Sequence, residues 1–108
     1  MTWESANPGD KMLRDVIFRL LDSDERLVDF LFDAETPRLR KRAGILKEDA
    51  WCFSDREQIL IRVSLDFWSC SGHVNLWELL DCLDDENLKR VLRAIAEVRE
   101  VRDVIKTD

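Results

Sequence analysis

The chain has little of what nucleotide chemistry and catalysis need. Its 108 residues include one histidine, no tyrosine, three glycines and two prolines, and they contain neither a P-loop nor a GxGxxG fingerprint. The only imidazole, His73, lies three residues after Cys70, with no recognisable oxyanion turn or third orienting group. The sequence therefore predicts a protein that is not an enzyme and that takes no cofactor.

Long apolar runs are also missing. No stretch approaches the roughly 18 apolar residues of a membrane span, and residues 1–11 are polar and acidic where a secretion signal is basic and then apolar. Cys52, Cys70 and Cys82 make an odd count, which is poor material for a disulfide framework. We therefore expect a cytoplasmic protein with buried, reduced thiols and no membrane contact. Its small size and acidity are typical of bacterial and phage proteins, so we expect a prokaryotic or viral source.

The charge is acidic overall but unevenly distributed. The formal net charge is −6, from 23 acidic and 17 basic residues. A basic segment contributes +5 without an intervening acid, which leaves −11 for the rest of the chain; its members are Arg38, Arg40, Lys41, Arg42 and Lys47. Because an acidic body is repelled by phosphate backbones, we expect no direct binding to nucleic acid.

Hydrophobic periodicity indicates helices throughout. Residues 1–9 are predicted to form a flexible lead, and residues 10–108 a single helical domain. A first helix is expected over about 10–22 with Asp10 as its N-cap, and a second over about 24–34, capped by Ser23 or Asp24.

The basic segment is predicted to form a short helical turn on the surface. Thr36 is a good N-cap, and Pro37 suits the first helical position because its missing N–H is not needed there. Gly44 is a natural stop for the helical turn expected over 37–43.

Capping signals define the second half of the chain. Ser54 and Glu57 form a capping box, which favours a helix over 59–67 although the apolar residues there alternate as in a strand. Asn75 and Glu78 repeat the signal before a helix over 76–82, and Asp84 begins a last helix that ends near Val104. The predicted fold is an all-α bundle of about five helices with a glycine loop (69–74) between two of them.

The helix–loop–helix around Gly72 resembles an EF-hand. With the glycine at the sixth loop position, Asn75 falls at the ninth and Glu78 at the twelfth, where a bidentate glutamate belongs. The first position is Phe67, which cannot bind a cation, and the third and fifth are neutral serines. We interpret the segment as a degenerate loop or as plain helix capping.

Zinc is a further possibility that the spacing disfavours. Cys70 and His73 with Cys52 and Cys82 would supply three thiolates and an imidazole. Structural zinc sites pair their ligands within short loops, whereas Cys52 and Cys82 are isolated and read as small core residues. We expect no metal site.

Four tryptophans in 108 residues are many. Trp51, Trp68 and Trp77 adjoin apolar neighbours and are expected in the core, with one or two as exposed anchors instead. Trp68 and Trp77 flank the glycine loop, which becomes a binding ridge if both point outward. The candidate interaction residues are Arg38, Arg40, Lys41, Arg42, Trp68 and Trp77.

These observations predict a small regulatory domain that binds another protein, whose identity the sequence does not give. Two alternatives are an acidic mimic of nucleic acid that inhibits a nuclease or polymerase, and a metal-dependent regulator that uses the EF-hand-like loop. A homodimer is also predicted, in which the basic segment of one copy meets an acidic stretch of the other; that stretch contains Asp22, Asp24, Glu25, Asp29 and Asp33.

Overall fold

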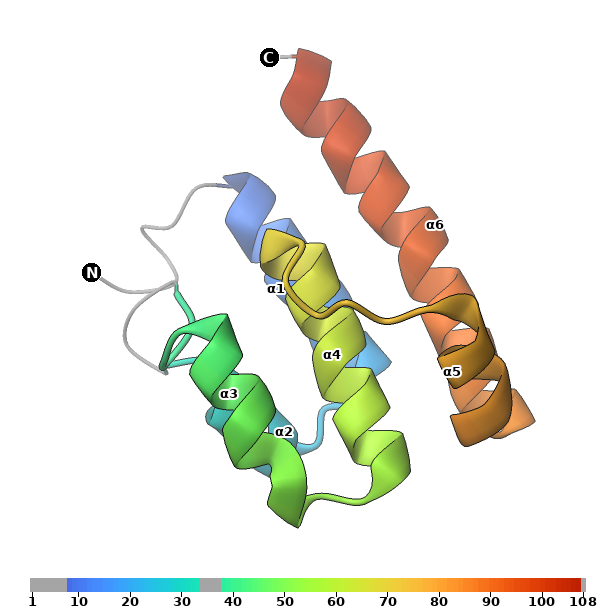
Figure 1. The fold of residues 1–108 in the computed structure, drawn as a ribbon. Helices are drawn as coiled ribbons and strands as arrows, with labels where there is room; N and C mark the ends of the chain where they lie inside the picture. The colour runs from blue at the N-terminus through green and yellow to red at the C-terminus, as the bar shows by residue number, and fades with distance from the viewer. Residues whose placement is uncertain (1–7, 34–37, 108) are drawn as a thin grey trace.

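The computed structural model describes residues 8–33 and 38–107, and it confirms the predicted all-α class. Over these residues the chain forms six α-helices and one turn of 3-10 helix, with no strand beyond one isolated bridge (Figure 1). None of the described helices is long and apolar enough to cross a bilayer. The elements are α1 (Pro8–Leu20), α2 (Glu25–Leu31), α3 (Ala43–Asp49), η2 (Ala50–Cys52), α4 (Asp55–Ser69), α5 (Leu76–Cys82) and α6 (Asp85–Thr107).

Helix α4 is the centre of the bundle. It contacts α1, α2, α3 and α5, while α6 runs along α1 (Figure 1). The buried apolar residues form one cluster, to which all six helices contribute. Each fully buried Leu, Ile or Val side chain contributes about 1.5–3 kcal/mol. The innermost side chains are Ile17, Leu20, Leu31, Leu46, Ile61 and Leu65.

Helices α2, α4, α5 and α6 start at predicted caps. The Ser54 hydroxyl accepts a bond from the Glu57 N–H at 3.2 Å, and the Glu57 carboxylate accepts one from the Ser54 N–H at 3.1 Å. The Asp24 carboxylate accepts from Arg26 N–H at 3.0 Å. Asp84 accepts from the Asn87 N–H at 2.9 Å. Each of these bonds satisfies a backbone donor that the first helical turn leaves free.

The segment over 59–67 is helical, as the capping box predicted. Its alternating apolar residues do not behave as in a strand, because α4 lies at the centre of the bundle and buries side chains on several sides. Ile59, Leu60, Ile61, Val63 and Leu65 are all buried. A helix that is buried on several sides loses the simple amphipathic pattern.

The first helix begins earlier than predicted. Pro8 and Gly9 belong to α1, so Asp10 lies in its first turn and is not the N-cap. Proline is well suited to the first turn, where a helix needs no N–H from it. Residues 1–7 of the predicted flexible lead lie outside the described residues.

The predicted helical turn over 37–43 is wrong for the residues that the structure describes. Residues 38–42 are not helical, and Leu39 pairs with Phe32 in the isolated antiparallel bridge. The Arg40 N–H donates to the carbonyl of Leu31 at 2.8 Å, so the backbone hydrogen-bonds to the end of α2 instead of to itself. Gly44 lies inside α3 and does not stop a helix. Thr36 and Pro37 fall outside the described residues.

Candidate functional site

The loop between α4 and α5 is built by tight backbone packing. Cys70 and His73 adopt left-handed backbone conformations, each with φ of 56°. Gly72 does not, so the left-handed residues of this loop are not its glycine. A Cβ atom at Gly72 would lie 1.8 Å from the carbonyl oxygen of Arg62. Glycine is needed there because the loop passes directly against the backbone of α4.

The side chain of Asp66 binds the backbone of this loop. Its carboxylate accepts hydrogen bonds from the N–H groups of Gly72, His73 and Val74, at 2.8, 2.9 and 3.1 Å. Hydrogen bonds to a charged acceptor are roughly twice as strong as neutral ones. The loop is therefore anchored to the last turns of α4 at three consecutive residues.

Arg62, one turn earlier on α4, holds the same loop and the first turn of α5. Its guanidinium donates to the carbonyl oxygens of Gly72 at 3.0 Å and His73 at 2.6 Å, and it pairs with the carboxylate of Glu78. The guanidinium lowers the pKa of Glu78, with a further contribution from the Asn75 cap. Three consecutive segments, α4, the loop and α5, are thus joined by one polar network.

This network also explains the resemblance to an EF-hand. Glu78, at the twelfth loop position, and the carbonyl oxygens of Gly72 and His73 are hydrogen-bonded to Arg62, a cation of the protein itself. Among the described residues, no three His, Cys, Asp or Glu side chains gather as a metal site requires. The oxygens that a calcium ion would bind are already used to position α5.

Helix α5 turns most of its apolar residues to solvent. Leu79 is buried, whereas Leu76, Trp77 and Leu80 are 75%, 73% and 56% exposed. We call these three residues the α5 face. Leu76 and Leu80 are one helical turn apart and Trp77 is adjacent, so the three side chains form one outward surface. Of the candidate residues flanking the loop, Trp77 therefore points outward.

The two other tryptophans that the structure describes, Trp51 and Trp68, differ from each other in exposure. Trp68 is half-buried and packs edge-on against Phe32, with ring centroids 5.0 Å apart, so the pair of outward tryptophans that a ridge requires is not formed. Trp51 in η2 is 79% exposed, so the expected core position is wrong for Trp51 and Trp77. Short helices bury only one narrow side, and local sequence does not say which side it is.

The basic segment is partly used within the chain. The Arg40 guanidinium donates to the carbonyl oxygens of Asp29 at 2.7 Å and Phe32 at 3.1 Å, which lie at the C-terminal end of α2. Lys41 pairs with Asp49 at 2.9 Å. Arg38 and Arg42 are exposed. Two of the four candidate cations thus stabilise local structure, since helix ends leave carbonyl groups without partners.

The cysteines are not core residues. Cys52, Cys70 and Cys82 are all free and exposed, so the prediction of buried thiols is wrong. Cys82 follows Leu79 and precedes Leu83, both buried, but it lies on another side of α5. Neighbours in a helix point about 100° apart, so adjacent apolar residues do not ensure burial.

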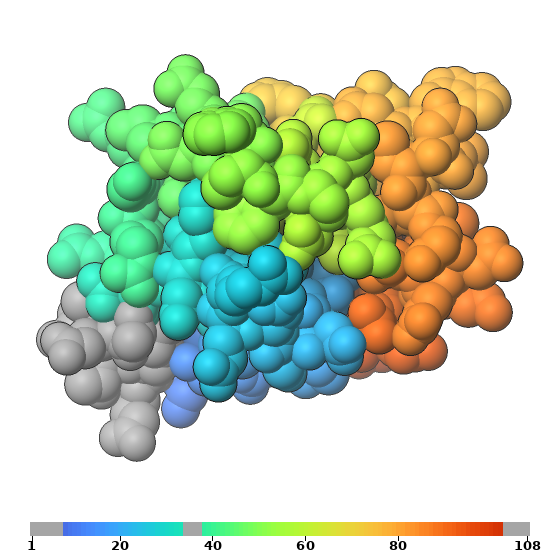
Figure 2. Space-filling model, turned by 90° about the horizontal axis from the view of Figure 1, so that it is seen from below, coloured from blue at the N-terminus to red at the C-terminus, as the bar shows by residue number. Residues whose placement is uncertain are grey.

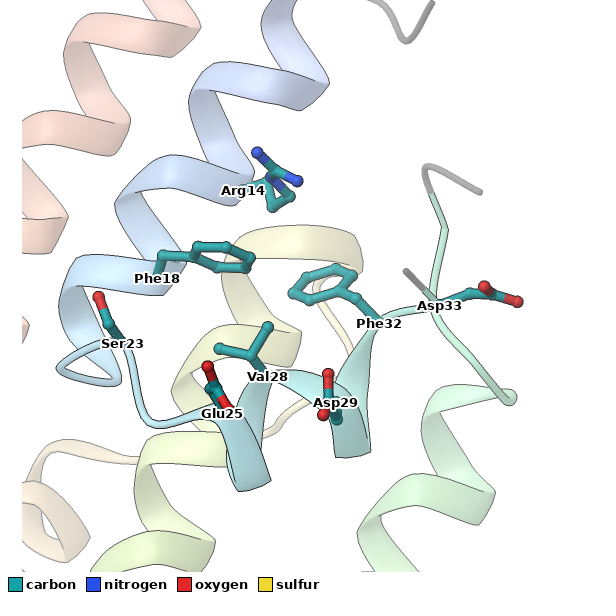
Figure 3. A pocket seen from close by; sticks show the side chains of 8 residues that line it. All are labelled: Arg14, Phe18, Ser23, Glu25, Val28, Asp29, Phe32 and Asp33. Carbon is teal, nitrogen blue, oxygen red and sulfur yellow. The ribbon is translucent and has the colours of Figure 1, made fainter. Parts of the chain in front are cut away.

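A cavity of about 530 Å³ opens between α1 and α2 (Figure 3). Phe18, Val28 and Phe32 give it apolar walls, and the Arg14 guanidinium lies 4.7 Å from the centre of the Phe18 ring. Ser23, Glu25, Asp29 and Asp33 complete the lining. The lining therefore combines apolar walls with three carboxylates and one guanidinium group.

A cleft lined by five carboxylates and two arginines lies at the end of the bundle that Figure 2 shows from below, where the segment after α1 meets the starts of α4 and α6. Glu57 accepts a bond from Arg26 at 2.7 Å, and Arg90 reaches Glu86 at 2.9 Å and Asp22 at 3.4 Å. The pKa of Glu57 is lowered, chiefly by the backbone bond from Ser54. Part of the negative charge of this cleft is therefore paired with guanidinium groups.

Arg62, Asp66, Leu76 and Leu80 are the residues whose importance sequence reasoning missed. Arg62 and Asp66 lie one turn apart on a polar stripe of α4, which resembles an ordinary solvated face. The available signal was the glycine loop that follows them, since a tight loop needs partners for its backbone groups.

No protein-family model matches the chain, and no curated protein or solved structure is significantly similar to it.

Proposed function

We propose that this protein is a non-enzymatic binding domain that docks onto another protein through the α5 face. The observation that carries the proposal is the exposure of three large apolar side chains, Leu76, Trp77 and Leu80, on a helix of seven residues. Isolated apolar residues are ordinary on protein surfaces, but adjacent ones on a single short element are typical of interaction sites. Tryptophan is the residue most enriched at the energetic centres of interfaces.

The support beneath the α5 face favours binding. Asn75 caps α5 with a bond from the Glu78 N–H to its side chain at 2.9 Å, and Arg62 holds Glu78 from the other side. A surface that is already ordered loses little conformational entropy on association. The polar network therefore gives the exposed residues a fixed arrangement without burying them.

Charge near the α5 face suggests the chemistry of the partner. Exposed carboxylates follow Leu80 along the chain, at Asp81 and Asp84. Interfaces place apolar residues at the centre and polar residues at the rim, with complementary charges across it. The partner that fits is a protein with an apolar pocket and basic residues at one side of it.

The ion pairs of the cleft between the segment after α1 and the starts of α4 and α6 make mimicry of nucleic acid the weaker proposal. A phosphate backbone presents an unbroken row of negative charge. Glu57 and Glu86 instead pair with Arg26 and Arg90. The paired carboxylates leave less free charge for a basic groove than the net charge suggests.

A photo-reactive amino acid placed at position 77 tests the proposal. Irradiation in the native host is expected to join this protein to one recurrent second protein. The matched control carries the same amino acid at position 51, because Trp51 is equally exposed but lies in η2. The proposal is contradicted if position 77 yields no product, or if both positions capture the same mixture.

A further inference from the structure

Helix α6 carries a second outward stripe, separate from the α5 face. Its residues recur at alternating spacings of three and four, which keeps them on one side of a helix. Leu92 and Ile95, at its middle, are 57% and 46% exposed, and Leu88 is half-buried. We call this stripe the α6 seam; it consists of Asp85, Leu88, Leu92, Ile95, Arg99 and Arg102.

The centre of the α6 seam lies on a different side of α6 from the ion pair with α1. Arg19 of α1 pairs with Glu97 at 2.7 Å, and Ala94 and Val101 are buried in the core. At 3.6 residues per turn, the centre of the seam lies roughly half a turn around the helix from Glu97. Leu92 and Ile95 are therefore the exposed apolar residues of the seam, whereas Leu88 packs partly against the core.

The charges of the seam change sign along its length. Asp85 is exposed at its first position, Arg99 and Arg102 are exposed at its last two, and the apolar residues lie between them. A second copy of the same helix, running in the opposite direction, places Leu92 opposite Ile95 of that copy. The same register sets Asp85 opposite Arg102, and Leu88 opposite the aliphatic stem of Arg99.

We propose that the protein forms a homodimer in which two α6 helices pack antiparallel along this seam. Every pairing then occurs twice through a two-fold axis near residues 93 and 94, as a closed symmetric interface requires. Apolar residues meet at the centre and opposite charges at both ends. Parallel packing would instead set Asp85 against Asp85 and Arg102 against Arg102.

This interface differs from the one expected from the basic segment. Arg40 and Lys41 already bond to groups of their own chain, whereas no ion pair that the structure describes engages Asp85, Arg99 or Arg102. The seam has its charges free at both ends and an uncovered apolar centre. It therefore offers a self-complementary surface that the basic segment does not.

Sedimentation equilibrium tests the dimer first. The wild-type chain of 12.8 kDa is expected to sediment with twice this mass at high protein concentration. Leu92→Arg is expected to weaken the association at least about tenfold, since it places charge at the apolar centre. Ile45→Arg is the matched control, because Ile45 is also exposed but lies on α3. A monomeric wild type, or a dimer that Leu92→Arg leaves intact, overturns the proposal.

Charge exchange tests the register and keeps the proposal testable if Leu92→Arg impairs folding. Asp85→Arg and Arg102→Asp are each expected to dissociate the homodimer, because each sets like charges opposite one another. A mixture of the two variants, and the double variant, are expected to restore the dimer. Glu100→Arg makes a similar change on another side of α6 and is expected to leave the dimer unchanged. The same monomer–dimer equilibrium in all four variants contradicts the register.

Discussion

Helices α2 and α5 have the same length and opposite relations to the core. Both contain seven residues, and both begin at a side-chain cap, Asp24 in one and Asn75 in the other. Helix α2 buries Leu27 and Leu31, whereas α5 buries Leu79 alone among its residues. The apolar residues of α2 hold the bundle together, and most of those of α5 do not.

The difference shows what replaces hydrophobic packing where a short helix buries little. A seven-residue helix is not stable by itself in water, so its position depends on tertiary contacts. For α2 these contacts include the burial of Leu27 and Leu31 in the core. For α5 they include the bonds from Arg62 to Glu78 and from Asp66 to the preceding loop, which leave the α5 face uncovered.

The largest expected effect on stability comes from a buried residue of α2. Leu31 has no exposed surface, so Leu31→Ala is expected to lower the free energy of unfolding by about 4 kcal/mol. Leu76→Ala removes the same atoms from an exposed site on α5 and is expected to change stability by less than about 0.5 kcal/mol. Urea denaturation of the two variants measures both values. Equal losses would show that Leu76 is part of the core.

Gly72→Ala is expected to cause the next largest loss of stability. The added Cβ would meet the Arg62 carbonyl at 1.8 Å, so the loop must move and lose bonds to Asp66, at a cost of about 3 kcal/mol. Gly44→Ala is the control, because a Cβ there meets nothing within 4 Å and the glycine lies in a helix. It is expected to stabilise the protein by about 0.5 kcal/mol. Equal changes in the melting temperatures of the two variants would contradict the close packing of the loop against α4.

Acid is expected to weaken the hold on α5. The folded pKa of Glu78 lies below its usual value of 4.5, because Arg62 stabilises the carboxylate. Its contribution is therefore complete above about pH 4.5 and lost as the pH falls through the folded pKa. Glu78→Gln is expected to be less stable than wild type near neutral pH, and the difference in stability is expected to shrink in acid. Parallel pH profiles for the two proteins would contradict this linkage.

The smallest expected effect is that of divalent cations. Adding Ca²⁺ is expected to leave the melting temperature unchanged, since Arg62 already engages Glu78 and the loop carbonyls. Zn²⁺ is expected to do the same. A ligand at a hundred times its dissociation constant would stabilise the native state by about 2.7 kcal/mol. A clear rise in melting temperature that Glu78→Ala or Cys70→Ser abolishes would restore the metal-dependent alternative.

Local signals in the sequence predicted the helices well where a cap marks their start. Asp24, Ser54, Asn75 and Asp84 each bond within three residues, so their role depends only on the neighbouring chain. The prediction for residues 37–43 was wrong because Arg40 bonds to α2, nine residues or more before it. A strong local cap signal does not reveal a competing partner elsewhere in the chain.

The candidate site was less predictable than the fold. Trp77 was named from its residue type alone, and its exposure depends on which side of α5 faces α4. That side is set by Arg62, sixteen residues before Glu78. The α6 seam was visible as a three-four repeat, but the sequence alone does not say whether such a stripe faces the core or solvent.

The most direct test of the account compares two tryptophans in one binding measurement. The protein that position 77 captures is titrated against wild type, Trp77→Ala and Trp51→Ala, with unfolding measured for each variant. Trp77→Ala is expected to weaken binding about thirtyfold, as for an interface centre worth about 2 kcal/mol, and to leave stability almost unchanged. Trp51→Ala is predicted to change neither. Unaltered affinity in Trp77→Ala, or a loss of stability that accounts for the weaker binding, would contradict the role of α5 as a docking surface.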